Sequence, residues 1–591
     1  MLMMAFVLSL TSSLAQTKTI TGKVLDDKGA PVPNASVLVM GTQVGTTTKL
    51  DGSFSLNVPA TGKTLVITSV NFEKQEVRLG ASNTYSITLK ASADDLEEVI
   101  VTGYQQQKKR EVNAAVSRID GKQIENIPAP SVDRLLQGRA SGVQVNANNG
   151  VPGGAVNILI RGAGSINAGT QPLFVVDGIQ INGATTNIQT QTNPIAFLNP
   201  DDIESFEILK DAAATSIYGA RGGNGVVLIT TKKGKAGKNE VMVNTQFGVT
   251  SPLKFFDVLN ISEIVQSRIE AVQNASPRAT AAAVRANVLA GLGINTAFTD
   301  DQIRGLTNYD WQAAGMQNGN VRQTNLSLRG GNDKTTYYVS GSYNSTEAIV
   351  TPVNFTRGTL LTSLSHKINR KLSIESQISL STISQNGPFG GAGGGAFLGN
   401  IAFAGPTILP HNPITNPDGS WYGLPGSGQA VAGILSFNPL AVNALNTNKQ
   451  RTNQMVGSFT INYEIAKGLR YQGKFGLDYR LVQTEFYGDP RLDEYLNRRG
   501  LGSANSNWNT NFLTFHTLNY NKTFGGKHSV SALAGTEYRN DVNEQIGASA
   551  EGFPTPDFRT INTAATPLGA TGFWTGSRVF SIFGRVSYEY D

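Results

Sequence analysis

The 591-residue sequence contains no cysteine, few charged residues and no long apolar run beyond its N-terminus. Without cysteine, disulfide frameworks and thiolate metal sites are excluded. Charged side chains make up 16% of the chain, against about 25% in a typical domain. The net charge of +6 is spread without a long basic run, so nucleic-acid binding has little support. A membrane helix would need roughly 18 to 20 apolar residues, so this chain could cross a membrane only as a closed barrel of strands.

Motifs for catalysis and for cofactor binding are missing as well. No Gly-x-x-x-x-Gly-Lys-Ser/Thr loop occurs, and Gly162-Ala163-Gly164 lacks the third glycine of a dinucleotide fingerprint. The glycines are therefore interpreted as turn residues. The four histidines are scattered and form no metal-ligand spacing: His366, His411, His516 and His528. We expect a protein that is not an enzyme and that holds no cofactor and no metal.

Residues 1–16 carry the pattern of a secretory signal peptide. An apolar run is followed by Ser13-Leu14-Ala15, a small-x-small cleavage pattern. We predict that residues 1–15 are removed on export. No Lys or Arg precedes the apolar run, which favours a true start upstream of Met1. The alternative is a buried N-terminal helix.

Residues 16–93 have the pattern of a small β-sandwich. Strands are expected over 19–25, 35–40, 52–58, 64–70 and 84–90, and the pair Asp51-Gly52 predicts a tight turn. The segments GKVLDDKGAPVPNASVLVMGT and TKLDGSFSLNVP resemble the carboxypeptidase-regulatory-like domain. No nucleophile or metal triad accompanies them, so no catalysis is assigned to this domain.

Residues 94–104, which include LEEVIVTGY, are predicted to be a segment that a partner protein grips. Glu97 and Glu98 keep it soluble, and the β-branched run that follows favours an extended backbone: Val99, Ile100, Val101 and Thr102. Such a segment can add to the open edge of another protein's sheet through main-chain hydrogen bonds. The alternative is that 98–102 forms one more strand of the preceding domain.

Residues 105–235 are predicted to form a globular α+β unit with several glycine turns. Asp211 is a candidate N-cap for a helix over 212–218 that ends at Gly219. Asn224-Gly225 then predicts a turn into a strand over 226–230.

Residues 236–591 show strict alternation of apolar and polar residues. Leu469, Tyr471 and Phe475 alternate with Arg470, Gln472 and Lys474, for example. About ten such strands are expected, most of them near the ten residues that a tilted strand needs to cross a bilayer. They lie near 240–249, 321–330, 334–345, 357–366, 371–382, 453–465, 469–482, 509–522, 528–540 and 577–590.

The connections between these strands distinguish a membrane barrel from a soluble sandwich. Short connections such as 331–333, 367–370 and 466–468 alternate with longer ones such as 250–320 and 383–452. Outer-membrane barrels have tight turns at the periplasmic end and long loops outside, whereas soluble sandwiches have no reason for this alternation. Aromatic residues near strand ends or on the apolar phase suit interfacial girdles; they are Tyr337, Tyr343, Phe459, Tyr463, Tyr520, Phe580, Tyr588 and Tyr590. An antiparallel soluble sandwich is the alternative.

The middle of the chain resembles the SusC/RagA type of TonB-dependent outer-membrane transporter. The resemblance lies in Ile160-Arg161-Gly162, in PLFVVDG over 172–178, in IESFEILKDA over 203–212 and in IYGARGGNG continuing to ITTKKG over 217–234. The plug residues that carry it are Arg161, Gly162, Asp177, Gly178, Lys210, Asp211, Tyr218, Gly219, Arg221, Gly222, Asn224 and Gly225. The resemblance is most specific over 96–235, and 97–102 stand where the family has its TonB box.

The resemblance implies a mainly β protein in five parts: signal peptide (1–15), carboxypeptidase-regulatory-like β-sandwich (16–93), TonB box and linker (94–104), α+β plug domain (105–235) and the first part of a large transmembrane antiparallel β-barrel (236–591). Family members have about 22 strands, and ten strands could not enclose a plug of this size. This implies an N-terminal fragment of a larger protein.

The resemblance also implies a function and partners. It implies import of oligomeric nutrients, glycans or peptides, across the bacterial outer membrane, with the N-terminal domain and plug facing the periplasm. TonB with its inner-membrane energising complex would pull the TonB box, and a SusD/RagB-like surface lipoprotein would deliver the cargo. The barrel would contact outer-membrane lipid. The alternative is a receptor with a mainly signalling or adhesion role.

Two further sets of residues are candidates for contacts within the protein or with cargo. Arg161, Asp177, Lys210, Asp211 and Arg221 could form ion pairs that hold the plug against the polar wall of the barrel, or could only cap helices and turns. Trp311, Trp421 and Tyr422 could stack on sugars, or could pack within their own loops.

Overall fold

The computed structural model describes residues 17–590 except for 28, 43, 60–61, 70–71, 91–98, 103–104, 109–114, 125–126, 128–130, 148–149, 155, 166–168, 182, 184–192, 388–400, 434–436 and 526. The predicted signal peptide, together with Glu97 and Glu98, therefore lies outside the described residues. Two compact units divide the chain: the described residues up to 99 and those within 107–112 belong to one, and the described residues within 100–106 and from 115 onward belong to the other.

The N-terminal unit is the expected β-sandwich. One sheet contains β4 (Ser53–Pro59), β1 (Thr17–Leu25) and β7 (Thr84–Thr88), and the other contains β3 (Gly45–Thr47), β2 (Ser36–Val39), β5 (Thr64–Thr68) and β6 (Gln75–Arg78). The alternating residues Ile20, Val37, Phe54 and Ile67 meet in the core. The five predicted strands are present, and the predictions missed β3 and β6.

The predicted partner-binding segment forms a strand of its own. β8 (Val99–Thr102) pairs with β9 (Gln105–Lys108) in a separate two-stranded sheet. Because only residues 103 and 104 connect the two strands, the pair is an antiparallel hairpin. Neither sheet of the N-terminal sandwich includes β8, so the alternative that 98–102 is one more strand of that domain is wrong.

The α+β unit, here called the plug, is built on a five-stranded sheet. Its order is β10 (Val116–Asp120), β15 (Ile203–Leu209), β16 (Val226–Thr231), β13 (Leu173–Val176) and β14 (Ile179–Gln180). A separate pair contains β11 (Val143–Ala147) and β12 (Val156–Ile160). Short helical turns connect these strands: η2 (Gly121–Gln123), η3 (Val132–Leu136), η4 (Pro200–Asp202), α1 (Ala212–Thr215) and η5 (Ser216–Asn224).

The helix predicted over 212–218 is shorter than expected. Asp211 is its N-cap, and the Asp211 Oδ1 atom accepts a hydrogen bond from the Ala214 N–H at 2.8 Å. The α-helix ends at Thr215 and continues as 3₁₀ turns in which Gly219 is not helical, with φ of +58°. Glycine tolerates this backbone conformation, so the predicted stop becomes a kink.

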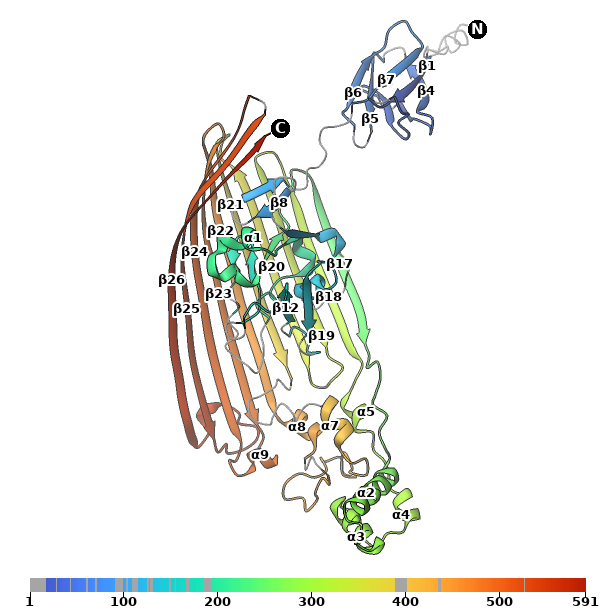
Figure 1. Ribbon diagram of the computed structural model, residues 1–591, viewed down its shortest axis with the longest axis vertical. Helices are drawn as coiled ribbons and strands as arrows, with labels where there is room; N and C mark the ends of the chain where they lie inside the picture. Colours follow the sequence, from blue (N-terminus) through green and yellow to red (C-terminus); the bar gives the residue numbers. More distant parts are fainter. Residues whose placement is uncertain are drawn as a thin grey trace, which may run out of the picture. The chain divides into compact units, whose positions relative to one another are not determined.

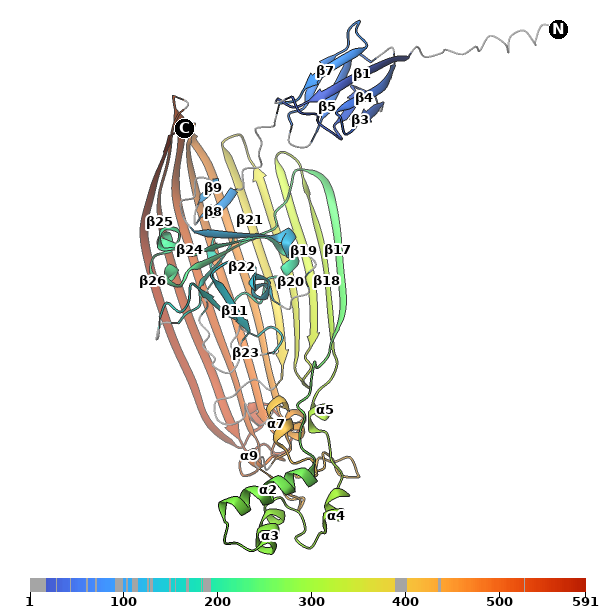
Figure 2. The ribbon, with the colours of Figure 1, turned by 45° about the vertical axis from the view of Figure 1, so that its right-hand side comes forward.

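The remaining chain forms one antiparallel ten-stranded sheet in sequence order. Its strands are β17 (Gly237–Thr250), β18 (Gly319–Gly331), β19 (Thr335–Glu347), β20 (Asn354–Lys367), β21 (Leu372–Asn386), β22 (Thr447–Ala466), β23 (Leu469–Gly488), β24 (Leu501–Phe524), β25 (His528–Glu551) and β26 (Thr566–Tyr590). In Figures 1 and 2 the sheet curves around the plug, and β17 and β26 are its two edges, so it is not closed. We call its concave face the strand wall.

All ten predicted strands are present with the predicted alternation, but most are longer than predicted. Phe475 and Tyr479 are exposed on the outer face, whereas Asp478 and Arg480 are buried on the strand wall. β24 and β25 each have 24 residues, more than twice the length needed to cross a bilayer. The predictions missed the ends near the long connections, because apolar alternation fades there. Asn505, Asn507 and Asn509 follow one another on one face of β24.

The long connections contain helices that the sequence analysis did not predict. They are α2 (Ile261–Ala275), α3 (Ala281–Gly291), α4 (Asp300–Arg304), α5 (Trp311–Gly315), α7 (Ile401–Thr407), α8 (Pro439–Leu445) and α9 (Asp493–Leu496). Capping boxes begin α2 at Asn260 and α4 at Thr299. Among the described residues, none of the helices has the length and apolar character of a membrane span.

Candidate functional site: contacts between the plug and the strand wall

The first contact is the tight turn between β13 and β14. Asp177 and Gly178 have φ of +48° and +84°, the geometry of a two-residue hairpin turn. The Asp177 carboxylate accepts hydrogen bonds from the Thr231 N–H and Oγ1, both at 3.0 Å, and from Gln377 Nε2 of β21 at 2.7 Å. Lys474 of β23 donates to the Asp177 carbonyl oxygen at 2.6 Å. Burial raises the pKa of the Asp177 carboxyl, while the Thr231 hydrogen bonds oppose this. The turn therefore joins the plug to two strands.

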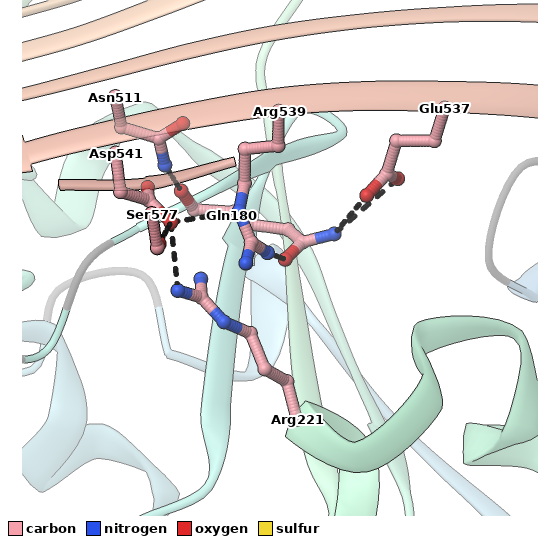
Figure 3. A network of polar contacts seen from close by, with 7 residues as sticks. All are labelled: Gln180, Arg221, Asn511, Glu537, Arg539, Asp541 and Ser577. Atoms are coloured by element: carbon pink, nitrogen blue, oxygen red, sulfur yellow. Dashed lines mark hydrogen bonds and ion pairs between the residues drawn. The ribbon is translucent and has the colours of Figure 1, made fainter. Parts of the chain in front are cut away.

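The second contact is a polar network between β14, η5 and the strands β24 to β26 (Figure 3). Arg221 reaches from the plug to Asp541 of β25, with its NH2 atom 2.9 Å from Oδ2. Arg539 donates to the same Asp541 oxygen at 2.8 Å and to Gln180 Oε1 at 2.6 Å. Gln180 donates to Glu537 at 3.3 Å. Charge-assisted hydrogen bonds in a buried setting are stronger than neutral ones, so this network fixes the edge of the plug.

The third contact surrounds η4 and reaches β18, β19 and β20. Tyr338 Oη of β19 donates to Asp202 Oδ1 at 2.7 Å, and Asn199 Nδ2 donates to Asn325 Oδ1 of β18 at 3.1 Å. Arg357 of β20 donates to the Ala196 carbonyl oxygen at 3.0 Å. Burial raises the pKa of the Asp202 carboxyl. The three contacts together attach the plug along most of the curved sheet.

Apolar packing supports these polar contacts. Val456, Leu513 and Phe515 project from β22 and β24 into the same buried cluster as the plug residues Ile179 and Val227. A Cβ atom on Gly476 of β23 would lie 2.0 Å from Ile179 Cδ1, so glycine at this position permits the close approach.

The remaining charged candidates act inside the plug. Asp211 Oδ2 accepts from the Ala115 N–H at 2.7 Å, and this hydrogen bond, followed by the one from Ala214, lowers the pKa of Asp211. Lys210 donates to the Ser141 carbonyl oxygen at 2.6 Å. Arg161 has φ of +58° and, within the described residues, makes no ion pair with the strand wall. Of the five candidates, Asp177 and Arg221 contact the wall, whereas Lys210, Asp211 and Arg161 make no contact with it among the described residues.

The glycine, asparagine and tyrosine residues of the plug signature determine the local backbone conformation and packing of the plug. The Asn224 side chain donates to the Gly169 carbonyl oxygen at 3.0 Å. A Cβ atom on Gly225, whose φ is +89°, would lie 2.7 Å from Ile160 Cδ1. Gly162 has φ of +96°, and a Cβ atom on Gly222 would lie 2.7 Å from the Thr215 carbonyl oxygen. Tyr218 is buried in a cluster with Val175 and Leu228.

Another member of the plug signature is a buried carboxyl. Glu207 on β15 is fully buried, accepts from Ser205 Oγ at 2.8 Å and lies 3.4 Å from Arg118 NH1. Burial raises the pKa of Glu207 to about 7. Its contacts stay within the central sheet of the plug.

The sequence analysis missed the residues on the strand side of these contacts. Glu537, Arg539 and Asp541 occupy alternate positions of β25, so they share one face of the strand. That alternation of charge is a readable signal for a polar interface. The plug residue that each of them contacts cannot be predicted from the sequence, because partners such as Gln180 and Arg539 are 359 positions apart.

The loop aromatics pack within their loops. Trp311 is buried, and its Nε1 atom donates to the Asn412 carbonyl oxygen at 3.1 Å. Trp421 packs against the same buried cluster as Trp311. The loop-packing interpretation is therefore confirmed for both tryptophans. Tyr422 is half-buried, with its hydroxyl 3.5 Å from the Ala430 carbonyl oxygen.

The wall contacts predict how charge reversal affects the plug. Asp177→Arg is expected to make the outer membrane leaky to vancomycin, because it places a cation beside Lys474 and Lys233 and removes the acceptor for Thr231 and Gln377. Leaving a buried charge unpaired costs about 3–5 kcal/mol. The measurement is vancomycin sensitivity of cells that display equal amounts of the intact protein.

Arg161→Glu is the matched control, since it reverses a neighbouring plug charge that has no ion pair on the wall. Sensitivity of Arg161→Glu cells is expected to equal that of the parent. Equal sensitivity of the Asp177→Arg and parent cells would contradict the assigned contact.

Comparisons with known proteins match this arrangement of a plug within a curved antiparallel sheet. Residues 108–226 match the TonB-dependent Receptor Plug Domain, and residues 20–101 match the CarboxypepD_reg-like domain. TonB-dependent receptor P3 of Formosa agariphila is 30% identical over 585 residues, which cover 98% of this chain and 53% of that protein. TonB-dependent receptor SusC of Bacteroides thetaiotaomicron is 28% identical over 612 residues, covering 98% of this chain and 55% of SusC.

The fold is also similar to that of a solved transporter. The structure of the RagAB peptide importer in its open-open state matches 84% of this chain and 55% of that chain, with a TM-score of 0.67 and 23% identity. The chain spans about half the length of the curated relatives it matches. The prediction of further strands in a longer protein stays a prediction.

The matches to the plug and N-terminal domains, together with these relatives, support a TonB-dependent receptor, and the relatives are outer-membrane proteins that are not enzymes. Within that class, the similarity to SusC and to the fold of RagAB supports the SusC/RagA type. The predicted fold class and the predicted lack of enzyme activity are confirmed by these relatives.

Proposed function

We propose that this protein imports oligomeric nutrients, glycans or peptides, across the outer membrane in a TonB-dependent cycle. One observation carries the proposal: the plug is attached to the strand wall by hydrogen bonds and ion pairs at three places, and a short strand precedes it in the chain. Polar contacts of this kind can break and re-form, because water can replace each hydrogen bond when the groups separate. The plug is therefore suited to leave the strand wall when force is applied and to bind it again afterwards.

The proposal assigns a role to each segment. Residues 1–15 direct export, 16–93 form the N-terminal domain, 94–104 hold the TonB box, 105–235 form the plug and 236–591 contribute strands to the barrel wall. Val99 to Thr102 would pair with TonB on the periplasmic side. The long connections that carry α2 to α5 would face the cell exterior and a SusD-like lipoprotein lid. RagAB, whose fold is similar, is a peptide importer, which supports an oligomeric cargo without choosing between peptide and glycan.

Uptake by the intact protein tests the proposal. Cells that carry it are expected to accumulate labelled oligosaccharides or oligopeptides, and deletion of TonB is expected to reduce accumulation to background while surface binding persists. Energised transport has this signature, because the plug closes the lumen without applied work. Accumulation that is unaffected by TonB deletion would contradict the proposal, and surface binding without accumulation in either strain would favour an adhesion or signalling role.

A further inference from the structure

A cavity of about 950 Å³ lies between the plug and the strand wall at the end where the connections are short. On one side it is lined by the Asp177-Gly178 turn and by Lys233 of the plug. On the other side it is lined by the inner faces of β20 to β24 and by the turns that contain Arg370 and Gly468. Cargo that passes the displaced plug would cross this space last.

The charge of the cavity is strongly unbalanced. Most of its remaining lining side chains carry hydroxyl or amide groups, such as Ser363, Thr460 and Gln472. Its charged lining consists of six cationic side chains, Lys233, Lys367, Arg370, Lys371, Arg470 and Lys474, and three acidic ones, Asp177, Glu375 and Glu464. Cations therefore outnumber acids two to one.

Two of the three acids already have partners. Lys233 Nζ lies 2.8 Å from Glu375 Oε2. Asp177 accepts from Thr231 and Gln377, and Lys474 is held against its carbonyl oxygen. Lys233 and Glu375 are thus an ion pair, and Asp177 and Lys474 are engaged in contacts that join the plug to the wall.

The other four cationic side chains are available to bind a ligand. Lys367, Arg370, Lys371 and Arg470 have exposed side chains, and none of them makes an ion pair within the part of the chain that the structure describes. Glu464 lies opposite Arg470 in the strand register and is the single acid among this group.

These cations face the lumen and not the lipid. Successive side chains of a strand point to opposite faces, and Arg470 is in phase with Lys474, which contacts the plug. In the same way Lys371 is in phase with Glu375 and Gln377, and Gln377 also contacts the plug. Tyr471 and Phe475, which are out of phase with Arg470, lie on the outer face of the sheet.

Acids elsewhere on the strand wall do not counter this charge. Asp541 is bonded to Arg221 and Arg539, and Asp478 accepts from Gln454 at 2.8 Å. An anionic ligand would therefore meet few unpaired acids along the described wall. Arg370 and Arg470 present planar guanidinium groups that suit bidentate binding of carboxylates.

We propose that this cavity binds carboxylate-bearing oligomers as they leave the lumen, and that the imported cargo is accordingly anionic. The inference rests on the proposed import function for its biological meaning, whereas binding at the cavity requires no transport. Uronic-acid oligosaccharides and acidic peptides share the carboxylate chemistry that the four cations recognise.

Equilibrium binding to the intact purified protein tests the inference. The variant Arg370→Gln, Lys371→Gln, Arg470→Gln removes three available cations without touching Lys233 or Lys474. The matched control Lys334→Gln, Lys467→Gln, Lys527→Gln removes three exposed cations from short connections at the same end that do not line the cavity. The probes are trigalacturonate, triglutamate and neutral galactotriose, titrated calorimetrically.

The parent and the control variant are expected to bind at least one of the two anionic probes with equal affinity. The cavity variant is expected to bind it about tenfold more weakly, as three lost solvent-exposed ion pairs would cause. Binding is expected to weaken with added salt. The identity of the tighter probe distinguishes a sugar source from a peptide source.

Three results would overturn the inference: equal affinity of the cavity and control variants, equal affinity of the parent for galactotriose, or no binding of either anionic probe. Failure of the import function is a separate result, because it would appear as lack of TonB-dependent accumulation in cells whose protein still binds the probe.

Discussion

A proline in β8, at Val101 for one edge of the strand or at Ile100 for the other, is expected to abolish import and to leave surface display and cargo binding unchanged. Residue 101 lies within β8, and strand addition by a partner needs the backbone N–H groups of that strand. Proline has no N–H, and its ring disrupts the ladder, at a cost of about 3 kcal/mol or more in a regular element. A loss of this size corresponds to a more than 100-fold weaker complex.

The hairpin with β9 makes the test specific for one edge of β8. Within the described residues β8 pairs with β9 alone, so one edge of β8 is occupied and the other is open. Successive N–H groups of a strand point to opposite edges. Proline at Val99 or Val101 therefore tests one edge, and Ile100→Pro tests the other. A difference between them would identify the edge that TonB uses.

Val101→Thr is the matched control, since threonine keeps the N–H and favours an extended backbone. It is expected to import at the parental rate. Uptake is measured with radiolabelled oligomer in cells that display equal amounts of each variant. Full import by Val99→Pro, Val101→Pro and Ile100→Pro alike would refute energised transport through this strand.

The strand pattern was readable from the sequence because one physical constraint governs it. A strand between lipid and a polar lumen must alternate, and Phe475, Gly476, Leu477 and Asp478 of β23 do so. The constraint ends where the strand leaves the lipid, and there the predicted ends of β24 and β25 were too short. Asn505 to Asn511 pair in register with β25 although no apolar phase marks them.

The helices of the long connections were missed for a different reason. Their apolar faces pack on one another in a small cluster that includes Val265, Val288 and Leu289, so they carry weaker periodicity than a helix on a large core. The signal that could have found them is local. Asn260 with Glu263, and Thr299 with Gln302, have the spacing of capping boxes.

The candidate site was predicted on one side only. The plug signature identified Asp177 and Arg221, because glycine turns beside charges are visible in sequence. The sequence could not predict which of these residues contact the wall and which only cap a helix or turn. Asp211 and Arg221 are both charged residues in a segment rich in turns, and nothing in the sequence distinguishes their roles. The partners on the wall depend on strand register and on how the plug is rotated, which sequence spacing does not specify.

The separation of the plug from the wall is the central claim, and a reversible cross-link tests it most directly. The chain contains no cysteine, so introduced pairs are unambiguous. A Cβ atom on Gly476 would lie 3.3 Å from Ile179 Cγ1, close enough for a disulfide between Ile179→Cys and Gly476→Cys. The reduced form of the same double-cysteine variant controls for the substitutions themselves.

Uptake of labelled oligomer is to be compared before and after reduction in cells that carry the double-cysteine variant of the intact protein. With the disulfide formed, as verified by gel mobility after cleavage between the two positions, uptake is expected to fall to the level of a TonB deletion and to recover on reduction. Parental uptake with the disulfide intact would contradict the claim that the β13–β14 hairpin must leave the strand wall for cargo to pass.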